Sequence, residues 1–168
     1  MDQPSLFDQP PILLTIPEAA RLLSIGRTLT YELIASGAEH PDPQLAERMR
    51  RIDGENTARM KEIVKQHGWP GPELIGEDGT RAAWLLVQHS TPEFQKEMLP
   101  LVKAAYEAGK LAGSNYALLQ DRVLVHEGKP QIYGSQGRWE NGVLGLQPIE
   151  DEANVDARRA QVGLRPLA

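Results

Sequence analysis

The chain has 168 residues, of which 40% are hydrophobic and 24% charged, and this composition fits one soluble globular domain or a domain with a short appendage. Its 23 acidic and 18 basic residues give a net charge of -5, which excludes a global positive field that would attract nucleic acid or anionic membranes. The absence of cysteine excludes disulfides and thiolate nucleophiles. No apolar run is long enough to span a membrane, and the first residues are acidic and proline-rich, unlike a signal peptide. We therefore expect a cytoplasmic protein without a membrane partner.

The N-terminal part divides into three predicted segments. Residues 1–11 are polar and rich in proline, so they offer too little apolar surface to offset the entropy of ordering, and we predict a flexible leader. Residues 12–37 carry two short helical patterns around a tight turn, with Gly37 as the stop signal. Residues 38–43 place two prolines in a polar stretch, which indicates a linker.

Residues 44–168 are predicted to form a compact helical domain. Apolar residues recur at helical spacing from Gln44 to Gln66, where a bend at Gly54 stays open. Residues 82–87 carry no polar side chain, which favours a central helix within Thr80–Ser90, with a buried strand as the alternative. Further helices are expected at Thr91–Gly109, Ser114–Glu127 and Asp151–Gln161.

One small β-hairpin is predicted near the C-terminus. Asn141 and Gly142 form a favoured pair for a type I′ turn, and the flanking segments Gln131–Tyr133 and Val143–Leu146 are the expected strands. The predicted fold class is therefore mainly α, with an N-terminal helix-turn-helix, a compact helical domain and one hairpin.

The segment from Leu14 to Gly37 reads LTIPEAARLLSIGRTLTYELIASG and resembles the helix-turn-helix of excisionase-type and MerR-like DNA-binding domains. In that family the second helix enters the major groove, so the resemblance implies that Arg27, Thr28 and Tyr31 lie near bases or phosphates. The basic β-wing of the family is missing, because residues 38–41 begin the linker. Two interpretations stay open: a DNA contact, as in a regulatory or excisionase-like accessory protein, and a helical hairpin that packs on the main domain.

Five motifs carry a second resemblance: HGWP at 67–70, AAWLLVQH at 82–89, DRVLVHEGKPQIYGSQ at 121–136, PIED at 148–151 and DARR at 156–159. With these motifs in this order, residues 56–167 resemble a bacterial domain family of unknown function, DUF6624. This resemblance implies no activity, so the function has to be inferred from the residues.

Three ionisable side chains are candidates for ligand binding or acid–base catalysis. Asp121 and Arg122 have apolar neighbours at helical spacing, so each needs a partner, either a structural one in the core or a ligand. The forked donors of Arg122 suit an anionic group. His89 follows the apolar run at a helix C-terminus, where it is either a capping residue or a general acid or base that Asp121 orients.

Amide and phenol side chains extend this pattern. Asn56 lies on an apolar stripe, and Tyr133 and Gln136 follow Gly128 in a region of loop or strand spacing. We predict a pocket for a small polar or anionic ligand, with a hydrolase or transferase that uses His89 and Asp121 as the enzymatic alternative. The predicted lining residues are Asn56, His89, Asp121, Arg122, Tyr133 and Gln136.

No metal and no cofactor are expected. His67, His89 and His126 have no ligand partner close in sequence, and the chain lacks a His-Glu-x-x-His motif. It also lacks a phosphate-binding P-loop and a Gly-x-Ser-x-Gly nucleophile turn. The sequence leaves the oligomeric state open.

Overall fold

A computed structural model of the chain describes residues 43–140 and 143–167, and this part is mainly helical, as predicted. The predicted leader, the helix-turn-helix segment with Arg27, Thr28 and Tyr31, and most of the linker lie outside the described residues. The chain divides into two compact units, the first ending at Leu86 and the second beginning at Val87.

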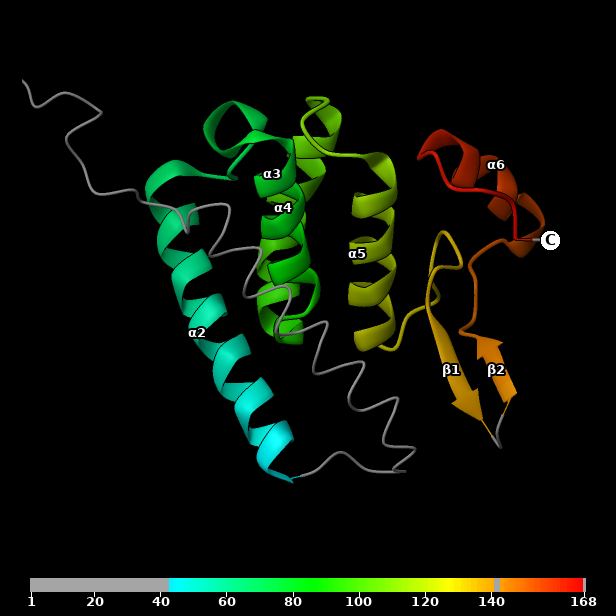
Figure 1. Cartoon of the computed structure of the whole chain (residues 1–168). Coiled ribbons are helices and arrows are strands. Elements are labelled where there is room, and N and C mark those ends of the chain that lie inside the picture. Colours follow the sequence, from blue (N-terminus) through cyan, green and yellow to red (C-terminus); the bar gives the residue numbers. More distant parts are fainter. Residues whose placement is uncertain (1–42, 141–142, 168) are drawn as a thin grey trace, which may run out of the picture. The chain divides into compact units, whose positions relative to one another are not determined.

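The first unit contains helix α2 (Pro43–His67) and most of helix α3 (Pro72–Gln88) (Figure 1). Gly54 lies inside α2, and Gly68, with a φ of 70°, follows its end. The apolar run at 82–87 is helical, so the strand alternative is wrong. The helix begins at Pro72, earlier than expected, and is interrupted at Gly76 (φ 72°, ψ 171°). Buried residues of this unit include Met60, Ile63, Ala82, Ala83 and Trp84.

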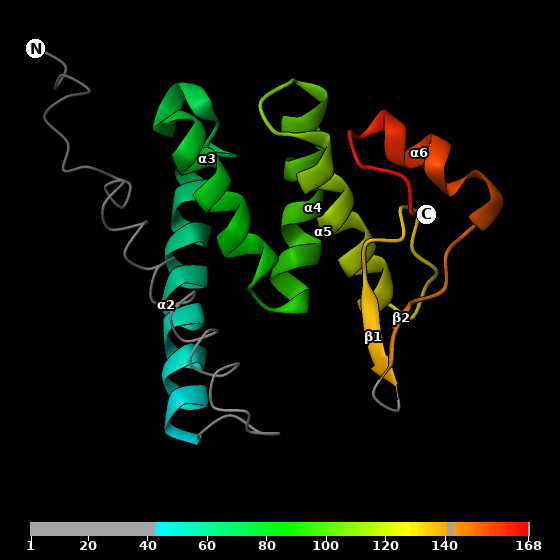
Figure 2. The ribbon, with the colours of Figure 1, turned by 45° about the vertical axis from the view of Figure 1, so that its right-hand side comes forward.

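The second unit is built around helices α4 (Pro92–Glu107) and α5 (Gly113–His126), which confirms both predicted helices and their stop regions. The hydroxyl of Thr91 caps α4 by accepting a hydrogen bond from the N–H of Phe94, and Pro92 occupies the first turn, where its missing donor costs nothing. The two helices pack side by side, and in both views α5 lies between α4 and the C-terminal elements (Figure 1, Figure 2). The core side chains of the pair include Phe94, Met98, Val102, Ala117, Leu119 and Val123.

The hairpin consists of strands β1 (Gly137–Glu140) and β2 (Val143–Leu146), which pair antiparallel with Glu140 opposite Val143 (Figure 2). The second strand was predicted correctly, but Gln131–Tyr133 as its partner is wrong. In a hairpin with a two-residue connection, the residues that directly flank the connection pair with each other. The partner of β2 is therefore the segment that ends at Glu140. Gln131 instead forms an isolated parallel bridge with Ile149.

The C-terminal part of the second unit contains a short 3₁₀ helix, η1 (Glu152–Asn154), followed by helix α6 (Val155–Gln161). Asp151 precedes η1 in a left-handed conformation with φ 46° and ψ 62°, and the helix predicted at Asp151–Gln161 is α-helical only from Val155. Val155 and Val162 are buried at the two ends of α6. Among the helices of residues 43–140 and 143–167, none combines the length and apolar character needed to cross a membrane.

Candidate functional site

The carboxylate of Asp121 organises a loop of residues 131–136, which we call the Asp121 loop. Asp121 is 0% exposed on α5. Its oxygens accept hydrogen bonds from the backbone N–H groups of Ile132 at 2.8 Å, Tyr133 at 3.0 Å and Ser135 at 3.0 Å. Several N–H donors stabilise a buried carboxylate and compensate for the loss of water. The arrangement therefore favours a structural role for Asp121.

Gln131 closes the same loop from within. It is 0% exposed, and its side-chain oxygen accepts a hydrogen bond from the N–H of Gln136 at 2.8 Å. Its amide nitrogen donates to the carbonyls of Gln136 at 3.0 Å and Gln147 at 2.7 Å. Because its donors are used within the loop and at the residue that directly follows β2, Gln131 fixes the path of the chain at the base of the hairpin.

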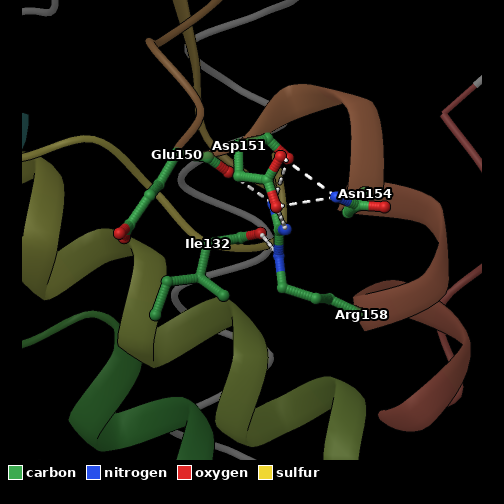
Figure 3. A network of polar contacts seen from close by, with 5 residues as sticks. All are labelled: Ile132, Glu150, Asp151, Asn154 and Arg158. Carbon is green, nitrogen blue, oxygen red and sulfur yellow. Dashed lines mark hydrogen bonds and ion pairs between the residues drawn. The ribbon is translucent and has the colours of Figure 1, made fainter.

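Two arginines of α6 bind the carbonyl groups of the Asp121 loop. Arg158 donates from Nε to the carbonyl of Ile132 at 2.9 Å and from Nη2 to the carbonyls of Glu150 and Asp151 (Figure 3). It also forms an ion pair with the Asp151 side chain at 3.4 Å. Arg159 donates to the carbonyl of Tyr133 at 2.6 Å. The sequence analysis did not identify either arginine as a site residue, although the DARR motif contains both.

A pocket of about 470 Å³ lies in the second unit, between the end of α3, the start of α4, the C-terminal half of α5 and the start of β1. None of its lining residues is acidic, whereas one is an arginine and two are histidines. We call it the Arg122 pocket. Its lining residues are Gln88, His89, Ser90, Pro92, Gln95, Arg122, Val125, His126, Gln136 and Gly137.

The structure brings together three of the six predicted pocket residues. His89, Arg122 and Gln136 line the Arg122 pocket, but Asp121 and Tyr133 do not. Asn56 is a half-buried residue of α2 in the first unit and is not among the lining residues. The predicted pairing of His89 with Asp121 is not formed, because the hydrogen bonds of the carboxylate go to the backbone of the Asp121 loop.

Arg122 is half-buried and held in place by two hydrogen bonds. Its Nε donates to Oε1 of Gln136 at 3.2 Å, and its Nη1 donates to the carbonyl of Gln88 at 2.8 Å. Burial lowers the pKa of Arg122, but a guanidinium stays protonated at neutral pH. Within the described part of the chain, Nη2 has no hydrogen-bond acceptor. A charged donor is therefore left over for a bound group.

The two histidines of the pocket lie at helix ends. His126 is the last residue of α5, and His89 directly follows α3; both side chains are exposed. The His126 side chain is close enough to Glu93 to help lower the pKa of that carboxyl, after larger contributions from the N–H of Glu93 itself and from Thr91. In the described ranges, no group of three or more His, Asp or Glu side chains is placed to hold a metal ion.

Two glutamines of the pocket have amide oxygens without a hydrogen-bond donor. Gln88 is 4% exposed and Gln95 is 2% exposed, and neither Oε1 atom has a partner among the described residues. The Gln95 amide has a defined orientation, because its nitrogen donates to the carbonyls of Gln88 at 2.9 Å and Ser90 at 3.0 Å. The sequence analysis missed both glutamines, although each follows or interrupts an apolar stretch.

Tyr133 belongs to an aromatic cluster. Its ring packs edge-on against Tyr116 with centroids 6.4 Å apart, and Tyr116 stacks on Tyr106 at 5.3 Å. Burial raises the pKa of Tyr133, and the charge of Asp121 adds to this shift. Burial also raises the pKa of Tyr116, to about 12. The cluster links α4, α5 and the Asp121 loop through packing.

The model of a protein family matches residues 13–168 of the chain, and that family is described as a family of unknown function, DUF6624. The matched span is wider than the motif-based range of 56–167 and includes the segment 14–37. No curated protein matches the chain, and no solved structure matches it.

Proposed function

Because the chain belongs to DUF6624, a family of unknown function, its activity has to be inferred from its own geometry, and we propose that it binds a small anionic molecule in the Arg122 pocket. The observation that carries this proposal is the unused Nη2 of Arg122, a charged donor in a pocket with no acidic lining residue. An arginine in such a setting binds carboxylate or phosphate oxygens with strong, directional hydrogen bonds.

The size of the pocket supports a small ligand. Its volume of about 470 Å³ falls within the range of roughly 300–1,000 Å³ that is typical of small-molecule sites. The two histidines add imidazole side chains, which form hydrogen bonds to polar ligands. A structural role of Arg122 accounts for its bonds to Gln88 and Gln136, and it leaves Nη2 available to a ligand.

The test is a titration of the full chain with inorganic phosphate, followed by calorimetry and by thermal unfolding. We expect saturable binding that raises the Tm and that is lost in Arg122→Gln while circular dichroism still shows a helical fold. Arg165→Gln is the matched control, because it removes the same charge from an exposed residue that does not line the pocket. Equal binding by the wild type and Arg122→Gln would refute the proposal.

A second candidate is acid–base catalysis on the bound anion. His89 and His126 line the same pocket as Arg122, so two imidazoles are available in the place of the predicted pair of His89 with Asp121. A hydrolase or transferase of this kind is expected to show a bell-shaped pH profile. His89→Ala and His126→Ala should then each abolish turnover of a substrate while binding of the anion persists.

DNA binding through residues 14–37 is a further candidate, and it depends on the resemblance to excisionase-type helix-turn-helix domains. Fluorescence anisotropy with duplex DNA at moderate salt tests it on the full chain. Arg27→Ala should abolish binding if this segment contacts DNA. The absence of cysteine is compatible with a reducing compartment such as the cytoplasm, which remains the expected location for these activities.

A further inference from the structure

Two residues that line the Arg122 pocket carry buried acceptors, in addition to the charged donor of Arg122. The amide oxygens of Gln88 and Gln95 are shielded from solvent, and neither receives a hydrogen bond from a described residue. Buried polar atoms in native proteins are nearly always paired, so two such atoms in residues that line one pocket need an explanation.

The Gln88 side chain is buried, but no hydrogen bond with a described residue fixes its amide. Its amide makes no hydrogen bond with a described residue, whereas its backbone carbonyl accepts from both Arg122 and Gln95. The terminal torsion of a glutamine has a broad, roughly two-fold preference, so exchanging the positions of the amide oxygen and nitrogen of Gln88 breaks no hydrogen bond with a described residue. Gln95 lacks this freedom, because both hydrogens of its amide are used.

From this arrangement we infer that the ligand of the Arg122 pocket is a hydroxylated organic anion, whose charged group binds Arg122 and whose hydroxyl donates to Gln88. This inference rests on the proposed function and specifies its ligand. A hydroxyl is favoured over an ammonium group as the donor, because the lining residues include an arginine and two histidines and no carboxylate. Hydroxylated phosphate monoesters and hydroxylated carboxylic acids both fit this description.

Two matched pairs of probes test the inference on the full chain. Glycerol 3-phosphate is compared with propyl phosphate, and 2,3-dihydroxypropanoate with propanoate, by calorimetry at one ionic strength. Each pair has the same carbon chain and anionic group, and only its hydroxyls differ. We expect the hydroxylated member of at least one pair to bind about tenfold more tightly, and the preferred pair identifies a phosphate or a carboxylate as the charged group.

The variant Gln88→Met assigns the preference to the amide. Methionine keeps the size and flexibility of glutamine but has no buried acceptor, and the backbone contacts of residue 88 remain. We expect the Tm of this variant to equal or exceed that of the wild type, and its preference for the hydroxylated probe to fall to about twofold or less. This combination distinguishes a ligand contact from a structural one, because losing a structural amide lowers the Tm.

Three outcomes overturn the inference. If both members of each pair bind equally to the wild type while phosphate binds through Arg122, the ligand class is wrong and the proposed function stands. If the preference persists unchanged in Gln88→Met, the hydroxyl is recognised by another group. If none of the anions binds and Arg122→Gln has no effect, the proposed function fails together with the inference.

Discussion

Nε of Arg122 lies 3.2 Å from Oε1 of Gln136, and this hydrogen bond joins α5 to the last residue of the Asp121 loop. Gln136 is itself fixed, because its amide nitrogen donates to the hydroxyl of Ser135 at 3.0 Å and its N–H donates to Gln131. The orientation of the guanidinium in the pocket therefore depends on the conformation of the loop.

Replacing Gln136 with leucine should weaken ligand binding more than it weakens the fold. The substitution keeps the size of the side chain but removes the acceptor that orients Arg122, so we expect affinity for phosphate to fall about tenfold and stability by about 1 kcal/mol. Calorimetry and urea unfolding measure the two effects. Gln161→Leu, at an exposed position of α6, is the control and should leave both unchanged. Unchanged affinity for phosphate in Gln136→Leu would show that ligand binding does not depend on the Asp121 loop.

Asp121→Asn should destabilise the second unit strongly. An asparagine has nearly the same volume, but its amide nitrogen cannot accept from the N–H groups that the carboxylate binds, and the charge is lost. We expect a loss of about 3 kcal/mol or more in the free energy of unfolding, as read from the urea midpoint. Asp78→Asn, at an exposed position of α3, should be neutral. A stable Asp121→Asn variant that fails to bind anions would instead favour a functional carboxylate.

Gly134→Ala should also destabilise the Asp121 loop. Gly134 has a φ of 65°, and a Cβ atom there would lie 2.9 Å from Cδ1 of Ile149 and 3.0 Å from Cδ1 of Leu167. Strain and overpacking together should cost about 2 kcal/mol or more. Gly54→Ala in α2 is the opposite case, since nothing lies within 4 Å of its Cβ and alanine favours helices by about 1 kcal/mol. The Tm should therefore fall in Gly134→Ala and rise in Gly54→Ala. An unchanged Tm in Gly134→Ala would show that the loop adapts to the added methyl group.

Stability should fall in acid partly through Glu127. Hydrogen bonds from Lys129 and then from Lys96, each at 2.6 Å, hold the pKa of Glu127 at about 2, against an ordinary value of 4.5. A lowered pKa means that the contribution is complete above pH 4.5 and disappears as the pH falls toward 2. The Tm of Glu127→Gln should therefore be lower than that of the wild type at pH 7, and the two should converge near pH 2. Because these groups are exposed, high salt should reduce the difference, and a difference that persists near pH 2 would contradict this account.

The helices were predictable because their signals are local. Thr91 and Pro92 start α4, and the apolar stripes that follow repeat at 3.6-residue spacing whatever lies elsewhere in the chain. Local patterns also suggested that Asp121 and Arg122 need partners, which the structure supplies. These inferences require only one segment at a time.

The first strand of the hairpin and half of the site were not predictable in this way. Gln131–Tyr133 has the spacing of a strand, but its N–H groups bind Asp121 and its carbonyls bind Arg158 and Arg159. Those partners come from two other helices, so no local pattern reveals them. The pairing of His89 with Asp121 failed for the same reason, and the amides of Gln88 and Gln95 became relevant only once α3 and α4 were placed around one pocket.

Neighbouring residues on a helix point about 100° apart, and α5 uses this angle to direct an acid and a base to different surroundings. Asp121 is directed to the backbone of the loop, while Arg122 is directed to the pocket. A displacement of α5 by one residue in one direction would bury the guanidinium against the N–H donors of the loop, and a displacement in the other direction would turn the carboxylate toward the carbonyl of Gln88. Either contact would be repulsive. The adjacent pair therefore disfavours misaligned packing of α5. The apolar residues of the helix do this less selectively, because they are similar to one another in shape.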